Sequence, residues 1–289
     1  MLAVRKDRTT QPSRTQAITY LLSVVMPVIC WYTGTQPPSF FRPKMQLSES
    51  GRWSLFFIHQ YFNIMNIFLD TADTQLIQDA YNTSLIDGVT TNPTLIMKSG
   101  RDPESVYQEL VDMGLTDISM EVVGNRKEMY EEGLRLAWKY KKIATIKVPC
   151  TPDGLAVCKE LSRQLVRVNV TLIFSVSQAI LAAKAGATYV SPFVGRVDDN
   201  SFGGLCLIKD IANTYAKQNW KRTEILAASI RNVRDVGRAF EYGANICTIP
   251  PKVFNSMYNH VLTDKGLDLF NNDWKSAQMA WLDNPKEIV

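Results

Sequence analysis

The sequence predicts an α/β protein, a (β/α)8 barrel of the TIM type with an additional C-terminal helix. From Met65 onward, short apolar runs alternate with longer amphipathic segments, which is the pattern of strands and helices in turn. Eight such units fit into about 200 residues, at the small end for this fold. An open doubly wound sheet is disfavoured because no glycine-rich GxGxxG turn follows an early strand.

The expected strands are short runs bounded by turn residues. They span residues 65–70, 87–91, 117–123, 143–149, 166–173, 188–194, 223–229 and 245–249. Between them, segments such as "DPESVYQELVDMG" repeat apolar residues at three- and four-residue spacing, as helices do. Gly186 and Gly243 suit left-handed caps that end two of these helices. A last segment, 266–282, exceeds the eight units and is expected to be a helix that could pack on a neighbouring subunit.

Residues 1–64 differ in composition from the rest of the chain. They carry seven basic and two acidic side chains, whereas residues 65–289 hold 25 basic and 26 acidic ones. A basic stretch precedes the apolar run 17–32, which resembles a signal peptide or short anchor, but this run is short for a spanning helix and Pro27 interrupts it. We therefore expect 1–64 to be an extension that is poorly ordered or absent from the mature protein, with translation beginning at Met65, and 65–289 to be the barrel.

Composition also disfavours several classes of function. The barrel part has no basic stripe, so nucleic-acid binding has little electrostatic support. The five cysteines are scattered without a CxxC pair, which indicates neither a disulfide framework nor a zinc site. With only two histidines, a histidine metal cluster is excluded and a histidine-centred triad is disfavoured. We expect no metal, no membrane partner and a reducing compartment, the cytoplasm.

Polar side chains near the ends of the expected strands are informative, because strands of a parallel barrel are buried on both faces and should be nearly all apolar. They are Asp70, Asn92, Glu121, Lys147, Asn169, Thr171, Ser191 and Ser229. Taken singly, Asp70 or Thr71 could cap a helix, and Asn92 before Pro93 could form a turn. Their recurrence on successive strands instead indicates one site at the carboxyl ends, where barrel enzymes place their active sites.

Lys147 lies in "IATIKVPCT", between apolar neighbours of a strand that has no edge in a barrel. Burial disfavours the charged ammonium and can lower the pKa of a lysine by several units. A neutral amine is a nucleophile toward carbonyls and can form a Schiff base. Glu121 could then relay protons through a water, and Asp70 could accept a hydroxyl proton while a carbon–carbon bond breaks. The iminium itself is the electron sink, so no metal is needed.

Two arginines follow late strands. Arg196 stands in "SPFVGRVDD" and Arg231 in "AASIRNVRD", with Ser229 nearby. Arginine forks bind phosphate oxygens bidentately, and phosphate sites after late strands recur in this fold. The competing interpretation is a surface ion pair with Asp198 or Asp235.

Several of these motifs together resemble the transaldolase family, in its short subfamily that includes fructose-6-phosphate aldolase. They are "FLDTADT", "GVTTNPTLI", "IKVPCTPDGL", "VNVTLIFSVSQA", "YVSPFVGRVDD" and "LAASIRN", and the resemblance covers about residues 65 to 280. It implies transfer of a dihydroxyacetone unit from sedoheptulose 7-phosphate to glyceraldehyde 3-phosphate, giving erythrose 4-phosphate and fructose 6-phosphate in the pentose phosphate pathway. It also implies a homo-oligomer based on pentamers, sugar-phosphate substrates and no cofactor.

The resemblance assigns roles residue by residue. It implies that Lys147 is the Schiff-base lysine, that Asp70 handles the proton of the hydroxyl next to the scissile bond, and that Glu121 acts with a water on the imine. Positioning of the donor and the catalytic water is implied for Asn92, Asn169, Thr171 and Ser191. Phosphate binding is implied for Arg196, Ser229 and Arg231, although the family's "SFR" is here "SIR".

Three alternatives remain at this point. Fructose-6-phosphate aldolase is one, but Glu121 and Phe193 stand where that enzyme has glutamine and tyrosine, which favours transfer to an aldose. A second, of another class, is an inactive barrel tethered to a membrane by residues 17–32 and acting as an interaction module. A pyridoxal-phosphate enzyme would also use a lysine imine, but no separate pyridinium partner is evident in the sequence.

Overall fold

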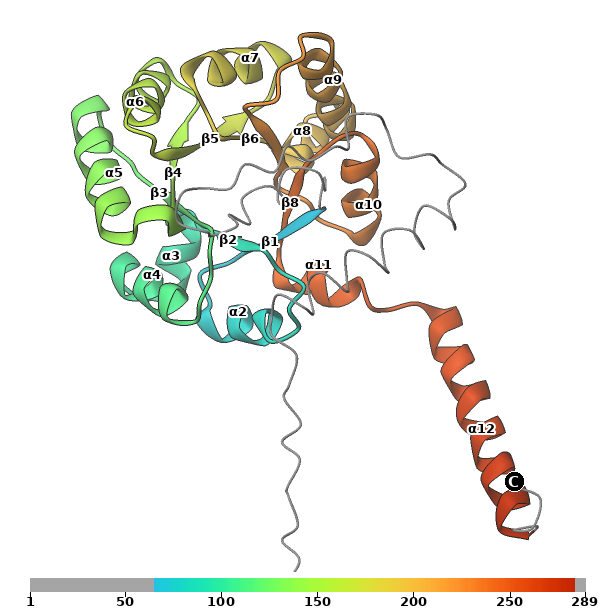
Figure 1. Cartoon of the computed structure of the whole chain (residues 1–289). Coiled ribbons are helices and arrows are strands. Elements are labelled where there is room, and N and C mark those ends of the chain that lie inside the picture. Colours follow the sequence, from blue (N-terminus) through green and yellow to red (C-terminus); the bar gives the residue numbers. More distant parts are fainter. Residues whose placement is uncertain (1–64, 284–289) are drawn as a thin grey trace, which may run out of the picture. The chain divides into compact units, whose positions relative to one another are not determined.

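The computed structural model describes residues 65–283. The predicted extension 1–64, including its apolar run, lies outside the described residues, which begin at the proposed start, Met65. Within the described part, eight parallel strands form a closed barrel in the order β1 to β8. Helices surround this barrel (Figure 1). The predicted (β/α)8 architecture is confirmed.

Each observed strand lies within a predicted range. The strands are β1 (Asn66–Asp70), β2 (Gly88–Thr90), β3 (Ile118–Glu121), β4 (Ala144–Pro149), β5 (Arg167–Ile173), β6 (Tyr189–Pro192), β7 (Glu224–Ala227) and β8 (Ile246–Ile249). The sixth ends earlier than the predicted residue 194. After Pro192, Phe193 forms only an isolated bridge with Ala228, and the chain turns directly into helix α8.

One or two helices follow each strand, and the last two, α11 and α12, come after β8. The helices are α2 (Thr74–Tyr81), α3 (Pro93–Ser99), α4 (Pro103–Asp112), α5 (Arg126–Tyr140), α6 (Pro152–Arg163), α7 (Val176–Ala185), α8 (Val194–Asp199), α9 (Gly204–Lys217), α10 (Val233–Glu241), α11 (Pro251–Ser256) and α12 (Val261–Asp283), with a short 3-10 turn at Lys141–Ile143. Local signals set several of their ends. Asp73 caps α2 by accepting from two backbone amides, and Gly186 ends α7 with φ near 97°, the left-handed conformation that glycine adopts most easily.

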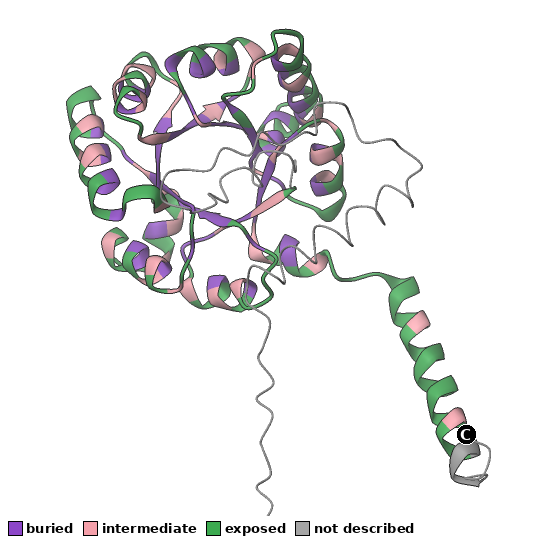
Figure 2. Cartoon of the chain, viewed as in Figure 1, coloured by how far each residue is buried: buried purple, intermediate pink, exposed green. Residues whose placement is uncertain are grey.

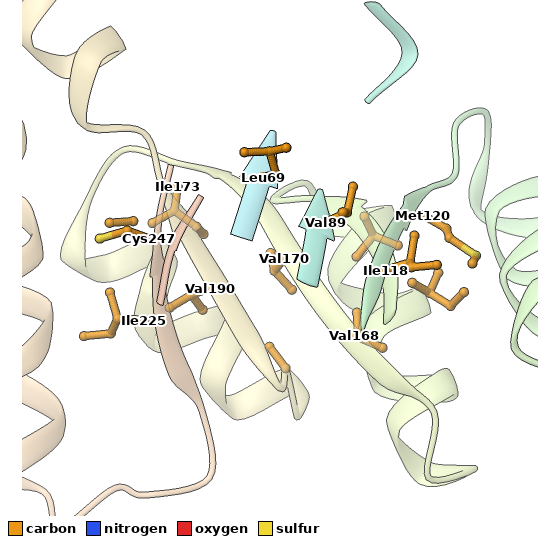
Figure 3. Packing of buried hydrophobic residues seen from close by; sticks show 14 of the residues in the cluster. Leu69, Val89, Ile118, Met120, Val168, Val170, Ile173, Val190, Ile225 and Cys247 are labelled. Carbon is orange, nitrogen blue, oxygen red and sulfur yellow. The ribbon is translucent and has the colours of Figure 1, made fainter. Parts of the chain in front are cut away.

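The apolar core lies between the barrel and its helices. Along each strand, alternate side chains point outward, and these are apolar residues such as Leu69, Val89, Ile118 and Val190, all fully buried. Figure 3 shows them in the packed cluster, and the strands are almost wholly buried in Figure 2. Burying one such side chain stabilises the fold by roughly 1.5–3 kcal/mol. A second, smaller apolar cluster contains Phe68, Tyr189, Leu226, Ala228 and Ile246.

A polar network closes the amino-terminal end of the barrel. The carboxylate of Asp117 accepts hydrogen bonds from Thr145 (2.8 Å), Arg167 (2.6 Å) and Tyr189 (2.7 Å). Because a buried carboxylate is costly unless it is paired and hydrogen-bonded, these three donors stabilise the end of the barrel opposite to the predicted site.

Helix α12 confirms the additional C-terminal helix and begins at Val261, earlier than the predicted residue 266. It is exposed along nearly its whole length (Figure 2), although it carries apolar side chains such as Leu262, Phe270 and Met279, each about two-thirds exposed. Across residues 65–283, every helix is too short or too polar to span a bilayer.

Candidate active site

Strand register brings the predicted polar residues together inside the barrel. Glu121 pairs with Lys147, and Lys147 pairs with Asn169, so these three stand in one row across β3, β4 and β5. Asp70 stands opposite Thr90 on the neighbouring strands β1 and β2. Since alternate side chains of a strand face the same way, the register predicts that both rows point into the barrel, near the carboxyl ends of the strands.

A cavity of about 120 Å³ opens at this end of the barrel. Among the predicted site residues, its lining includes Asp70, Asn92, Lys147, Ser191, Phe193, Arg196 and Ser229. It also includes residues that the sequence analysis did not select, namely Thr90, Leu226, Ala228 and Thr248. Parts of the chain far apart in sequence thus converge on one pocket, as the recurrence of polar strand ends predicted.

Lys147 is the buried amine of this pocket. Only 5% of the residue is exposed, and its Nζ lies 3.0 Å from Oε2 of Glu121. The same nitrogen donates to the backbone oxygen of Thr91 at 3.1 Å. The predicted proton relay from Glu121 through a water to the forming carbinolamine stays a prediction, and the structure adds a direct contact between the two side chains. Glu121 can therefore exchange a proton with the amine without an intermediary.

Asp70 supplies a second carboxylate. Burial raises the pKa of its side chain, while the nearby charge of Lys147 and a hydrogen bond from Thr90 counteract part of this rise. The Thr90 hydroxyl donates to Oδ1 at 2.8 Å. Since Asp73 caps α2, the alternative interpretation of Asp70 as the cap of this helix is wrong. A carboxyl with a raised pKa in a pocket suits proton transfer.

Behind the lysine lies a group of buried polar side chains. The Ser191 hydroxyl donates to Oδ1 of Asn169 at 2.7 Å, and the Asn169 amide donates to Ser119 at 3.2 Å. The Thr171 hydroxyl is buried and has no hydrogen-bond partner within the described residues. A buried polar group without a partner is costly, and Thr171 is not among the residues that line the cavity.

Asn92 has two roles. Its side-chain oxygen accepts from the backbone amide of Leu95 and so caps α3, and the residue also lines the cavity. Asn92 thus caps a helix instead of forming the expected turn, and this cap does not compete with a role in the site. Because the cap uses the oxygen, the amide nitrogen is the group that Asn92 can offer to a ligand.

Arg196 is the arginine that lines the cavity. It lies in α8, and its guanidinium is 4.9 Å from the centre of the Phe193 ring, a cation–π distance. Gly195 lets α8 approach the loop after β7, because a Cβ there would lie 2.4 Å from the Ser229 backbone oxygen. Ser229 itself has φ near 59°, a left-handed conformation of the kind that is found at functional sites.

Arg231 is outside the lining of the cavity. It forms an exposed two-pronged ion pair with Asp199, and this hydrogen bond lowers the pKa of Asp199. The competing interpretation of a surface ion pair is therefore correct in kind, but the partner is neither Asp198 nor Asp235. Exposed pairs are worth little, so the contact does not prevent Arg231 from turning to an anionic ligand.

Two threonines were missed by the sequence analysis. Thr90 is the last residue of β2, two residues before Asn92, and Thr248 interrupts the apolar strand "ICTI". The rule that found the other residues, a polar side chain in a buried strand, applies equally to both. They were overlooked because threonine is common in strands, and because no polar residue was selected on the eighth strand.

Together, the fold and the pocket define a TIM-barrel enzyme whose site joins a buried lysine to two carboxylates at the carboxyl ends of the strands. Comparison with known proteins agrees. A sequence model of the family Transaldolase/Fructose-6-phosphate aldolase matches residues 67–282. The chain belongs to this family.

Similar proteins align over nearly their full length. A probable transaldolase of Caulobacter vibrioides is 51% identical over 219 residues, which are 75% of this chain and 100% of that protein. A probable transaldolase of Paracoccus denitrificans is 51% identical over 211 residues, 73% of this chain and 96% of the other. One from Cereibacter sphaeroides is 50% identical over 219 residues, 75% of this chain and 99% of the other.

Proposed function

We propose that the protein is a transaldolase that uses Lys147 as a Schiff-base nucleophile. The observation that carries this proposal is the buried contact of 3.0 Å between Lys147 Nζ and Glu121 Oε2. It lies beside the cavity that Lys147 and Asp70 line. An amine, a proton acceptor beside it and a second acid–base group are the parts that imine chemistry needs.

The chemistry follows from these positions. Glu121 first accepts a proton from the Lys147 ammonium, and the freed amine attacks the C2 carbonyl of a ketose phosphate. The protonated Glu121 gives this proton to the carbonyl oxygen. Glu121 then takes a second proton from the nitrogen and passes it to the carbinolamine hydroxyl, which leaves as water. Asp70 then accepts the proton of the C4 hydroxyl. The oxygen electrons form the new carbonyl, while the C3–C4 bonding pair moves to C3 and leaves an enamine with the iminium nitrogen. An incoming aldose takes up the three-carbon unit by the reverse steps.

Phosphate recognition is assigned to the arginines near the pocket. Arg196 borders the cavity, and Ser229 and Arg231 lie on the adjoining loop, where Gly195 packs against both. We propose sedoheptulose 7-phosphate and glyceraldehyde 3-phosphate as substrates and erythrose 4-phosphate and fructose 6-phosphate as products, in the pentose phosphate pathway. The free thiols of the four described cysteines are compatible with the reducing cytoplasm, where we place the reaction.

Transfer to an aldose is favoured over release of free dihydroxyacetone. Glu121 can move protons, which a glutamine cannot do, and Phe193 presents a ring without a hydroxyl to the cavity. The bound enamine therefore lacks a phenolic group that could help a water to protonate it. Both features support a transaldolase rather than a fructose-6-phosphate aldolase.

A turnover assay tests the proposal. With fructose 6-phosphate and erythrose 4-phosphate, we expect sedoheptulose 7-phosphate and glyceraldehyde 3-phosphate to form, and no formation by Lys147→Met. Without erythrose 4-phosphate, little dihydroxyacetone should appear. Rapid release of dihydroxyacetone without an acceptor would instead identify an aldolase, and no turnover in either assay would favour the inactive interaction module.

We also propose a homo-oligomer, pentameric or decameric, that is built through α12. The exposed apolar side chains of this helix, among them Leu269 and Phe270, support this proposal because isolated proteins rarely expose such faces. Light scattering of the full chain should give a mass of five or ten protomers, and Phe270→Asp should reduce it. A monomer in the unmodified protein would contradict this assembly.

A further inference from the structure

Three side-chain oxygens from adjacent strands stand in a row beside the cavity. They are Oδ1 of Asp70 on β1, Oγ1 of Thr90 on β2 and Oγ1 of Thr248 on β8. The Thr90 hydroxyl donates to Asp70 at 2.8 Å, and it lies 2.6 Å from the Thr248 hydroxyl. Both threonines are almost fully buried, at 2% and 3% exposure.

The number of available hydrogens fixes which group donates in each of these two hydrogen bonds. A hydroxyl has one hydrogen and two acceptor lone pairs, and an ionised carboxylate has no hydrogen to give. When Asp70 is ionised, Thr90 spends its only hydrogen on Asp70. The short contact between the two threonines can then form only if Thr248 donates to Thr90. Thr248 thus orients the Thr90 hydroxyl, and Thr90 in turn orients the carboxylate.

The other polar groups near Asp70 are engaged elsewhere and do not orient its carboxylate. Lys147 on β4 acts on the carboxyl through its charge, but its nitrogen is in contact with Glu121 on β3 and with the Thr91 backbone oxygen. Arg196 on α8 borders the same cavity, while its guanidinium lies over the Phe193 ring. Within the described residues, Thr90 is the side chain whose hydrogen bond shifts the pKa of Asp70.

We propose that Thr248 is a positioning residue for the step that breaks the carbon–carbon bond. Through Thr90, it holds the Asp70 carboxylate in the orientation that accepts the proton of the substrate hydroxyl next to the scissile bond. In that step the proton passes to Asp70, the oxygen electrons form the carbonyl, and the electrons of the broken bond enter the enamine, so atoms and charges balance. The inference rests on the proposed transaldolase chemistry and adds a residue to it.

Thr248→Val tests the inference, because valine keeps the shape of threonine and removes its hydroxyl. Chains of hydrogen bonds strengthen one another, so loss of the donor should weaken the bond from Thr90 to Asp70. We expect kcat for transfer from fructose 6-phosphate to erythrose 4-phosphate to fall by roughly tenfold, the effect of one hydrogen bond. The acidic limb of the kcat profile should move to higher pH, since the bond that lowers the pKa of Asp70 is weakened.

Two measurements separate positioning from general damage. Borohydride trapping of fructose 6-phosphate on Lys147 should proceed to the wild-type extent in Thr248→Val, because imine formation does not need Asp70. Thr248→Ser, which keeps the hydroxyl, should retain the wild-type rate and pH profile. The matched control is Thr145→Val, which removes a buried hydroxyl from Asp117 at the other end of the barrel and should leave the kinetics unchanged.

The possible outcomes distinguish the two proposals. An unchanged kcat and pH profile in Thr248→Val would overturn the positioning role, and so would an equal loss in Thr145→Val or a loss of trapping as large as the loss of turnover. If Thr248→Val does not fold, Thr248→Ala carries the same expectations without the branched methyl group. A wild-type enzyme that neither turns over nor becomes trapped would instead overturn the proposed transaldolase function.

Discussion

Glu121→Gln is the substitution that probes the pair at the centre of the site. Glutamine keeps the length and shape of the side chain, so the pocket should be preserved while the negative charge is lost. The pair is largely shielded from water, with 7% of the Lys147 side chain and 15% of the Glu121 side chain exposed. The change therefore removes both the counter-ion of the ammonium and the group that we assign to proton transfer during imine formation.

The distance sets the size of the expected effects. At 3.0 Å, the attraction of two unit charges is about 5 to 6 kcal/mol for an effective dielectric constant near 20. The cost of burying both charges offsets much of this attraction. We expect Glu121→Gln to lower the free energy of unfolding by about 1–3 kcal/mol, the range for a hydrogen bond to a charged group.

The kinetic effect should be larger. A general acid–base group contributes about 10²- to 10⁴-fold, and the glutamine amide can still orient a water, so we expect the lower end. A loss of about 10²-fold corresponds to an increase of about 2.7 kcal/mol in the activation free energy of the reaction. It should appear in kcat and in the rate at which borohydride traps fructose 6-phosphate, whereas KM should change less.

The matched control is Glu160→Gln, which removes one partner of the exposed pair with Arg126. This variant should trap and turn over at wild-type rates. Trapping by Glu121→Gln at the wild-type rate would refute the reasoning, because the carboxylate would then have no part in making the imine.

Four further substitutions have defined outcomes. Phe193→Tyr should raise dihydroxyacetone release without an acceptor, and unchanged release would contradict the assigned role of the ring. Asp199→Asn should free Arg231 and lower KM for fructose 6-phosphate by about two- to threefold; an unchanged KM would speak against Arg231 as a phosphate ligand. Because burial raises the pKa of Asp70, kcat should fall as pH drops through a value above the usual carboxyl range, and Asp70→Asn should abolish turnover. Asp117→Asn should lower the free energy of unfolding, measured by urea denaturation, by about 1–3 kcal/mol. A loss of kcat in the folded variant would contradict a purely structural role for Asp117.

The fold was accessible from the sequence because barrel strands leave a local signal. Each strand is a short apolar run, and the alternation of strands and helices fixes the architecture. The end of the sixth strand was not accessible. It depends on contacts with the segment after β7, where Val194 and Gly195 donate backbone hydrogen bonds to Ala228 and Ser229, and no local pattern encodes such a partner.

The candidate site residues could likewise be predicted where they leave a local signal in a strand, and could not where their role depends on contacts between distant segments. A lysine inside a strand that is buried on both faces has few structural explanations, so the predicted barrel already made Lys147 a candidate for chemistry. Thr248 lacks that signal, since a threonine in a strand is ordinary, and only its 2.6 Å contact with Thr90 gives it meaning. The pairing of Arg231 with Asp199 likewise depends on the approach of α8 to the loop after β7.

The most direct test of the central claim is the identity of the trapped residue. The full-length protein is incubated with fructose 6-phosphate and borohydride, digested, and analysed by mass spectrometry. We predict a reduced imine adduct on the peptide that contains Lys147, and no adduct in Lys147→Met. An adduct that persists in Lys147→Met, or an active wild-type enzyme without any adduct, would contradict the assignment of Lys147 as the nucleophile.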